Sequence, residues 1–452
     1  MRRKIGTILF LIGAYLPSNA QVDAGKGASV SSIVVELRTG KVIEEYCADV
    51  LLTPASLTKL LTTAATLEMC GPQKKIETVA YLSVDNNQLI IKGKCDPTMG
   101  SKYYQWHSVE AFASDIASNL KKQKHTQIDC IVFDSGYISG STYFSKRLWE
   151  DMGNYYGVAP NAFCIADNMS TYSFASPAEV GEKCTLTSIL PNEGQKVDCL
   201  VKTYGKQSDS VYIYGMGQQW YATGCMPCAK VNYMVKGTMV NPQKVFEQKF
   251  VSELNRLGIK IVDSKSVTAF NYSNCNKIAT SYSPTIESII KVTNHESVNL
   301  YADALMLHLA GEKQTSVDAG MQQLRTFVGR INKSECMLYD GSGLSPMNAL
   351  SARQMANVIL YMAKSEYARE YEASLAVAGV SGTMKRLGKN TPIENRVKGK
   401  SGSMTGVLSY AGIITAKSGK QYVFCIIINH SQLNSSELRQ RVANWLTTFV
   451  GR

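Results

Sequence analysis

The sequence lacks the features that mark several large classes of protein. After residue 20, no stretch of about 18 apolar residues is free of charge, so we expect no transmembrane segment in the mature protein. There is also no arginine-rich arm and no zinc-finger spacing, which argues against nucleic acid as a partner. The formal net charge of +12 would suit an anionic partner such as a cell-wall polymer or a membrane surface, but the basic residues are scattered and most of the charge is expected to be solvated surface.

Histidine is scarce, and this limits the hydrolytic mechanisms that the chain can use. Only five histidines occur, and no second ligand pair accompanies the single CxxC at Cys225 and Cys228, so we expect no metal and no other cofactor. The Gly-x-Ser-x-Gly elbow of α/β-hydrolases is absent as well. His295 lies close to Ser297 in the sequence, but its helical surroundings favour a surface position. A Ser-His-Asp hydrolase is therefore disfavoured.

The twelve cysteines form an even set, which permits disulfides in an exported protein without specifying their pairing. The CxxC lies in a Gly- and Tyr-rich strand pattern rather than in a βαβ unit, so a thioredoxin-like role is disfavoured. We expect this pair to serve packing or to form a local bridge.

The first twenty residues have the order of a secretory signal peptide. Arg2, Arg3 and Lys4 precede an apolar run that starts at Ile5, and small residues follow up to Ala20. The run is too short to span a bilayer, and a buried first helix is the alternative interpretation. No cysteine follows it closely, so a lipid anchor is not expected. These features predict export to the periplasm.

The chain length predicts more than one domain, because a single hydrophobic core seldom serves 452 residues. Helical patterns from Pro54 to about Met69, and again after about residue 284, enclose a region of short alternating strands. We expect a catalytic domain split between residues 21–72 and 284–452. Residues 73–283 would then be an inserted β-rich region of two subdomains.

Several individual elements are also predicted. Residues 29–46 have the pattern of a hairpin, with its turn at Thr39 and Gly40. An amphipathic segment predicts a helix from about residue 242 to 257. Near the C-terminus, the patterns predict two apolar strands and then a helix: Val407–Thr415, Gln421–Asn429 and about 436–450.

The first candidate for catalysis is the pair Ser56 and Lys59. Residues three apart share a helical face, so the lysine amine would lie beside the serine hydroxyl. A serine needs such a base, and a lysine serves as one only if its pKa is lowered. The same spacing occurs at Ser118 and Ser288, but both lie inside helical patterns. Ser56 instead follows Pro54 at a helix start, where its backbone N–H is free to bind an oxyanion.

Two further motifs follow along the chain. Ser297-Val-Asn299 is a short polar triplet, which alone would indicate only a surface turn. Lys400-Ser401-Gly402 begins a strand, where the glycine would let a substrate backbone approach closely. A second Lys-Ser-Gly copy at residues 417–419 lies between two apolar strands and predicts a hairpin turn.

The three motifs, in this order, match the Ser-x-x-Lys, Ser-x-Asn and Lys-Thr-Gly set of penicillin-recognising serine enzymes. The chain resembles the D-alanyl-D-alanine carboxypeptidase/endopeptidases among the class C low-molecular-mass penicillin-binding proteins. The resemblance covers nearly the whole mature chain and includes five further segments: Thr53–Leu60, Cys95–Thr98, Trp149–Tyr156, Asp340–Ser345 and Ala378–Thr383. It implies an α+β fold like that of penicillin-binding proteins and β-lactamases, with an antiparallel sheet flanked by helices.

The resemblance also implies a role for each motif residue. Ser56 attacks the carbonyl of the penultimate D-Ala and Lys59 takes its proton. Ser297 passes a proton to the leaving amine, Asn299 holds the substrate amide, and Lys400 adds positive charge. Ser401 binds the terminal carboxylate, and the backbone N–H groups of Ser56 and Ser403 form the oxyanion hole. The resemblance does not decide between removal of the terminal D-Ala and cleavage of D-Ala cross-links. It also implies that β-lactams are covalent inhibitors.

Four positions concern substrate preference. Asp151 and Tyr156 match the residues that face the diamino acid of the peptidoglycan stem peptide in this family. Ser401 replaces the usual Thr and keeps the hydroxyl. Pro346 replaces an Arg that is thought to bind the carboxylate of diaminopimelate, so we expect weak discrimination between diaminopimelate and lysine.

Two alternatives within the same fold stay open. One is a β-lactamase-like hydrolase, which would need an efficient deacylation water. The other is a non-catalytic protein that binds β-lactams or cell wall. Intact Lys59, Ser297 and Asn299 argue against a dead site.

Overall fold

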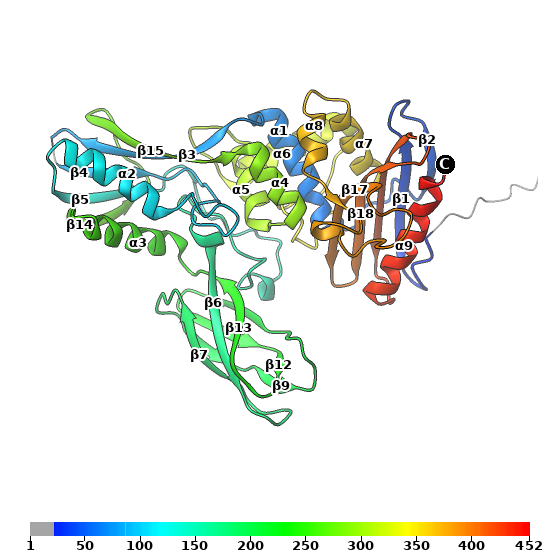
Figure 1. The fold of residues 1–452 in the computed structure, drawn as a ribbon, viewed down its shortest axis with the longest axis horizontal. Helices are drawn as coiled ribbons and strands as arrows, with labels where there is room; N and C mark the ends of the chain where they lie inside the picture. The colour runs from blue at the N-terminus through cyan, green and yellow to red at the C-terminus, as the bar shows by residue number, and fades with distance from the viewer. Residues whose placement is uncertain (1–21, 86) are drawn as a thin grey trace, which may run out of the picture.

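A computed structural model describes residues 22–85 and 87–452 (Figure 1). The predicted signal peptide, residues 1–20, lies outside these residues. Within them, no helix is both long enough and apolar enough to cross a membrane.

A six-stranded antiparallel sheet joins the two ends of the chain (Figure 1). Strand β1 pairs with β19, so that Ile33 lies opposite Cys425. The strand order is β16-β17-β18-β19-β1-β2, with these bounds: β1 Ser29–Glu36, β2 Val42–Tyr46, β16 Ala376–Val377, β17 Val397–Met404, β18 Val407–Thr415 and β19 Gln421–Asn429. The predicted hairpin and both predicted apolar strands are therefore confirmed.

Helices cover both faces of this sheet, which explains its apolar strands. In β19, Val423 and Cys425 belong to the core on one face, while Phe424 and Ile426 belong to the core on the other. A strand buried on both faces is apolar along its whole length. The second face is covered by α9 (Ser435–Val450), and the first by α1 (Thr58–Cys70), α4 (Ile286–Glu296), α5 (Asn299–His308), α6 (Val317–Asn332), α7 (Ala352–Ala363) and the short α8 (Ala368–Ala373).

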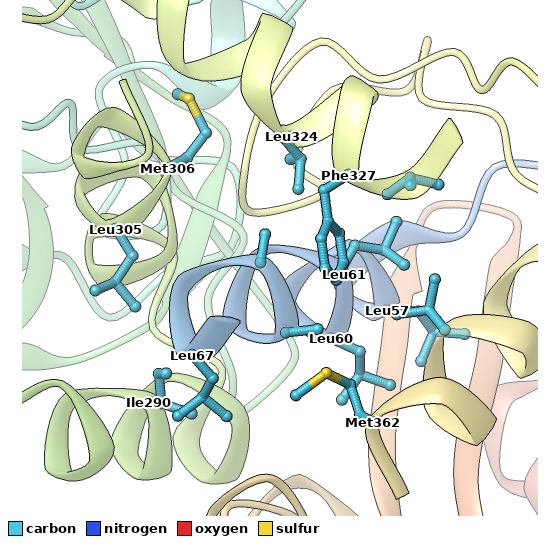
Figure 2. Close-up of a cluster of buried hydrophobic side chains, with 14 of the residues drawn as sticks. Leu57, Leu60, Leu61, Leu67, Ile290, Leu305, Met306, Leu324, Phe327 and Met362 are labelled. Carbon is cyan, nitrogen blue, oxygen red and sulfur yellow. The ribbon is translucent and has the colours of Figure 1, made fainter. Parts of the chain in front are cut away.

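Helix α1 lies at the centre of the larger core. All ten residues from Thr58 to Leu67 are buried. Figure 2 shows side chains of α4, α5, α6 and α7 around it, among them Ile290, Phe327 and Met362. A helix that is enclosed on every side cannot shift without disturbing several neighbours, so its first turn is a rigid support.

The chain between α1 and α4 forms two further parts of the structure. A five-stranded sheet of order β14-β5-β4-β3-β15 carries helices α2 (Val109–Lys122) and α3 (Pro242–Arg256), which confirms the helix predicted near 242–257. Phe133 of this sheet packs edge-on against Phe246 and Phe250 of α3. The strands are β3 (Lys75–Ser83), β4 (Gln88–Lys92), β5 (Gln127–Asp134), β14 (Lys260–Val267) and β15 (Cys275–Thr285).

The second part, residues 169–238, is a group of short strands that we call the small β unit. It extends away from the body of the molecule (Figure 1). Its strands are β6 (Met169–Ser176), β7 (Thr185–Leu190), β8 (Lys196–Cys199), β9 (Lys202–Tyr204), β10 (Tyr212–Met216), β11 (Gln219–Thr223), β12 (Cys225–Pro227) and β13 (Lys230–Thr238). Cys225 and Cys228 carry free thiols, as do the other ten cysteines, so the CxxC forms no local bridge here.

Candidate active site

Ser56 lies on a tight 3₁₀ turn, Ala55–Leu57, directly before α1. Ala55 adopts a left-handed φ of 48°, a conformation that costs energy for a residue other than glycine. Two close approaches hold the turn: a Cβ at Gly343 would lie 1.9 Å from Ala55 O, and a Cβ at Gly402 would lie 2.6 Å from Pro54 O. The absence of a side chain at Gly402 therefore leaves room for the nucleophile turn.

Lys59 follows one helical turn later and its amine faces Ser56. Its Nζ lies 3.0 Å from Ser56 Oγ, 2.5 Å from Asn299 Oδ1 and 2.7 Å from the backbone oxygen of Ser342. The side chain is fully buried. Burial lowers the pKa of Lys59 to about 7, against the opposing effects of Asp303 and Asp340. A large fraction of this amine is therefore neutral at pH 7 and able to accept a proton.

Ser297 and Asn299 lie at the corner between α4 and α5. Ser297 caps the end of α4 in the left-handed region, with φ 62° and ψ 40°, and α5 begins at Asn299. The Asn299 amide nitrogen donates to Tyr156 O at 2.7 Å, while its Oδ1 accepts from Lys59. Asn299 thereby connects the buried lysine to the segment that carries Asp151 and Tyr156.

Strand β17 forms the opposite side of the site. Lys400 is fully buried and its Nζ donates to Ser401 O at 2.7 Å. Burial, together with the nearby charge of Lys59, lowers the pKa of Lys400 well below its usual value. The Ser401 hydroxyl donates weakly to Thr383 O, at 3.4 Å.

These elements enclose a cavity of about 490 Å³. Seven of the ten predicted site residues line it: Ser56, Asp151, Tyr156, Ser297, Asn299, Ser401 and Ser403. The other three, Lys59, Lys400 and Gly402, lie behind this surface. Pro346 lines the cavity too, where the resemblance placed the missing Arg.

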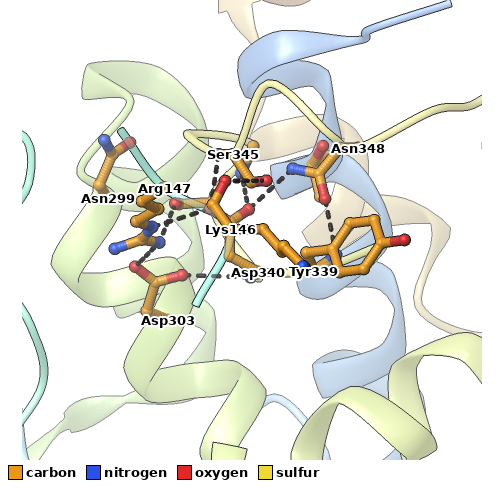
Figure 3. Close-up of polar contacts among 12 residues, drawn as sticks. Lys146, Arg147, Asn299, Asp303, Tyr339, Asp340, Ser345 and Asn348 are labelled. Atoms are coloured by element: carbon orange, nitrogen blue, oxygen red, sulfur yellow. Dashed lines mark hydrogen bonds and ion pairs between the residues drawn. The ribbon is translucent and has the colours of Figure 1, made fainter. Parts of the chain in front are cut away.

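Sequence reasoning did not identify Arg147, whose side chain is buried beside the site. Its guanidinium lies 2.6 Å from Asp303 Oδ2 and 2.9 Å from Asp340 Oδ2, and it donates to Ser342 Oγ at 2.8 Å (Figure 3). The backbone oxygen of Ser342 accepts a hydrogen bond from Lys59. Arg147 is therefore connected to Lys59 through one intervening residue, Ser342. Its partners are 156 to 195 positions away in sequence, so no local motif reveals the contact.

Asp340 organises the loop in front of Arg147. Burial would raise its pKa, but Arg147 and hydrogen bonds, including one from Asn348, hold the pKa below its usual value. It also accepts from the backbone N–H groups of Gly343 and Ser345, at 2.8 Å each (Figure 3). A charged Asp340 thus fixes the loop that packs against the Ser56 turn.

Residues 16–449 match the D-Ala-D-Ala carboxypeptidase 3 (S13) family. The chain belongs to this family. It is 26% identical to the penicillin-sensitive carboxypeptidase A of Dictyostelium discoideum, covering 88% of this chain and 82% of that protein. It is 23% identical to the D-alanyl-D-alanine carboxypeptidase DacB of Haemophilus influenzae, covering 94% and 92%.

The fold agrees with this family assignment. The crystal structure of penicillin-binding protein 4 from Haemophilus influenzae superposes with a TM-score of 0.80 at 21% identity, over 95% of this chain and 98% of that one. The S13 assignment confirms the predicted enzyme class, a serine-type D-Ala-D-Ala carboxypeptidase, and the predicted fold class. The cavity residues to which sequence reasoning assigned no role include Glu150, Tyr212 and Glu296.

Proposed function

We propose that Ser56 is the nucleophile of this S13 enzyme and that Lys59 is its general base. Ser56 Oγ would attack the carbonyl of the penultimate D-Ala while its proton passes to Lys59 Nζ. The carbon–nitrogen bond then breaks, and Ser297 relays the proton held by Lys59 to the departing D-Ala amine, which leaves Lys59 neutral again. Water hydrolyses the acyl ester and restores Ser56. The backbone N–H groups of Ser56 and Ser403 would stabilise the oxyanion in both steps.

The contacts of Lys59 are the observation that carries this proposal. Its amine lies between Ser56 Oγ and Asn299 Oδ1, in a buried place that lowers its pKa to about 7. A base with a pKa near the working pH is the most effective at proton transfer. Lys400 and Ser401 complete the proposed site by attracting and binding the terminal carboxylate of the substrate.

Asp151 and Tyr156 are the proposed binding site for the side-chain amine of the diamino acid. The Tyr156 hydroxyl donates to Asp151 Oδ1 at 3.0 Å, which orients the carboxylate in the cavity. Burial raises the pKa of Asp151, and the charge of Glu150 adds to that rise. An ammonium group from the substrate would oppose both effects, because it stabilises the charged form of Asp151 and so lowers the pKa of that carboxyl.

The proposed substrate is the D-Ala end of peptidoglycan stem peptides, in the periplasm. The enzyme class, the chain's predicted signal peptide and the basic net charge support this location. β-Lactams are the proposed covalent inhibitors, in line with the penicillin sensitivity named for the Dictyostelium relative. We further propose the domain division in which residues 73–283 interrupt a catalytic domain formed by residues 21–72 and 284–452.

Labelling with a fluorescent penicillin tests the nucleophile. Wild-type protein should be labelled, Ser56→Ala should not, and Ser118→Ala should be labelled fully. Ser118 is a matched control because it begins a Ser-x-x-Lys sequence on the exposed face of α2. Labelling that survives Ser56→Ala would reject the assignment. Steady-state turnover of a D-Ala-D-Ala peptide beside that of a β-lactam separates the carboxypeptidase from the β-lactamase-like and non-catalytic alternatives.

A further inference from the structure

A second hollow adjoins the active-site cavity. This hollow has a volume of about 420 Å³ and is bounded by the small β unit on one side. Tyr155, Tyr156 and Tyr212 line both spaces, so the two are neighbours across a shared aromatic wall. A substrate that is bound at Ser56 and extends past Tyr156 would enter the second hollow next.

The two spaces carry opposite charge. Three carboxylates line the active-site cavity, those of Glu150, Asp151 and Glu296, and its lining includes no lysine or arginine. The second hollow is lined by Lys102 and Lys236, with Asp209 as its one acidic side chain. The charge that lines the two spaces therefore changes from negative around Asp151 to positive beside the small β unit.

The charged side chains of the second hollow differ in whether they already have a hydrogen-bonded or charged partner. Asp209 accepts hydrogen bonds from the Tyr233 hydroxyl, at 2.8 Å, and from Val211 N, at 3.4 Å. Lys102 and Lys236 are exposed, and within the described part of the chain neither forms an ion pair with a carboxylate. Lys102 instead lies over the ring of Tyr103, with its Nζ 4.8 Å from the ring centre. Since no carboxylate of the described residues neutralises them, both amines can meet an anionic group.

We propose that this hollow binds a carboxylate on the residue that precedes the diamino acid in the substrate. The enzyme presents negative and then positive charge, and such a peptide presents an ammonium group and then a carboxylate in the same order. In a stem peptide that residue is a γ-linked D-glutamate, whose α-carboxylate is either free or amidated. The inference rests on the proposed function, because Asp151 sets the direction in which the peptide extends. Binding of this carboxylate would make the enzyme selective for stem peptides whose γ-linked residue carries a free α-carboxylate.

The expected selectivity is modest. Exposed lysine–carboxylate pairs contribute little each, so two of them predict a preference of about fivefold in kcat/KM for the free acid. The preference should appear mainly in KM, because the contact lies far from the reacting carbonyl and is equally present in the transition state. It should fall when the salt concentration rises, since salt screens exposed charges.

The test compares three substrates: an N-acetyl-L-Lys-D-Ala-D-Ala tripeptide, and two pentapeptides that differ only in a free or amidated α-carboxylate on the γ-linked residue. Wild-type enzyme should prefer the free acid, and the Lys102→Gln/Lys236→Gln variant should cleave the two pentapeptides at equal rates. Lys122→Gln, an exposed change on α2, should keep the wild-type preference. Penicillin labelling of Ser56 reports whether each variant is folded.

Two outcomes overturn the inference: equal cleavage of both pentapeptides by wild-type enzyme, or a preference that persists in the double variant. A wild-type enzyme that fails to cleave even the tripeptide would instead reject the proposed function, so the two failures are distinguishable.

Discussion

Helix α1 supports the nucleophile turn of the active-site cavity, and the small β unit contributes Tyr212 to the rim of that cavity, but the two elements are held in opposite ways. Ten consecutive residues of α1, with Lys59 among them, are buried in a core that draws on six helices and the main sheet. The small β unit has a core of only nine buried residues, on strands of three to nine residues. The comparison indicates that the reacting groups have a rigid support, while the substrate-binding rim is carried by a weaker structure.

The small β unit still positions part of the rim. Gly153 O accepts from Thr238 N at 2.8 Å, and Asn154 Oδ1 accepts from Ile213 N at 3.3 Å. These contacts hold the segment that contains Asp151 against β10 and β13. Loss of the small β unit should therefore affect peptide recognition more than acylation by a small β-lactam.

The largest effect is expected from Arg147→Ala. It would leave Asp303 and Asp340 buried without their cation, which costs about 3–5 kcal/mol in the free energy of unfolding. The positive charge of Arg147 also helps to lower the pKa of Lys59, so the pH profile of acylation should move to higher pH. Thermal unfolding and acylation rates measure the two effects. Arg369→Ala, which removes an exposed ion pair, is the control, and equal stability of both variants would contradict the prediction.

A matched pair of truncations tests the comparison itself. Leu61→Ala in α1 and Ile213→Ala in β10 each remove a fully buried side chain, and each should cost about 2–5 kcal/mol locally. Leu61→Ala should lower global stability and slow acylation. Ile213→Ala should raise hydrogen exchange only in residues 169–238 and leave penicillin labelling intact. Equal exchange throughout the chain in both variants would show that the two regions unfold as one unit.

The pH dependence of acylation follows from the burial of α1. A lysine with a pKa of about 7 is neutral above that pH and protonated below it, so the rate should rise with pH and level off above about 8. At pH 5 the neutral fraction predicts a rate about 100-fold below the plateau. Stopped-flow acylation by a chromogenic β-lactam measures this profile. A rate that is flat from pH 5 to 8 would exclude Lys59 as the base.

A smaller effect is expected at the rim. Asp151→Ala should lower kcat/KM for lysine- and diaminopimelate-containing peptides alike by roughly tenfold, as the loss of one charge-assisted contact would. Acylation by benzylpenicillin, which has no diamino acid, should change little. A strong preference for diaminopimelate that is unaffected by Asp151→Ala would show that another group binds the second carboxylate, despite Pro346.

Sequence reasoning was most accurate where local chemistry decides the structure. Strands β18 and β19 have the predicted bounds because continuous apolar runs end at polar turns. The first turn of the nucleophile helix was less well predicted: Ser56 lies on a 3₁₀ turn and α1 starts only at Thr58. The close packing of Gly343 and Gly402 against that turn, which no local pattern encodes, imposes this geometry.

The sequence by itself determined the family, the enzyme class and the order of the motifs, because each motif is a short run whose chemistry depends on neighbouring residues. Only the tertiary structure decided how those motifs meet. It placed Arg147 between Asp303 and Asp340, buried Lys400 deeply enough to lower its pKa, and brought Tyr212 to the rim. These outcomes depend on burial and on contacts between residues far apart in the chain, and the electrostatic effect of a charge is set by its three-dimensional surroundings.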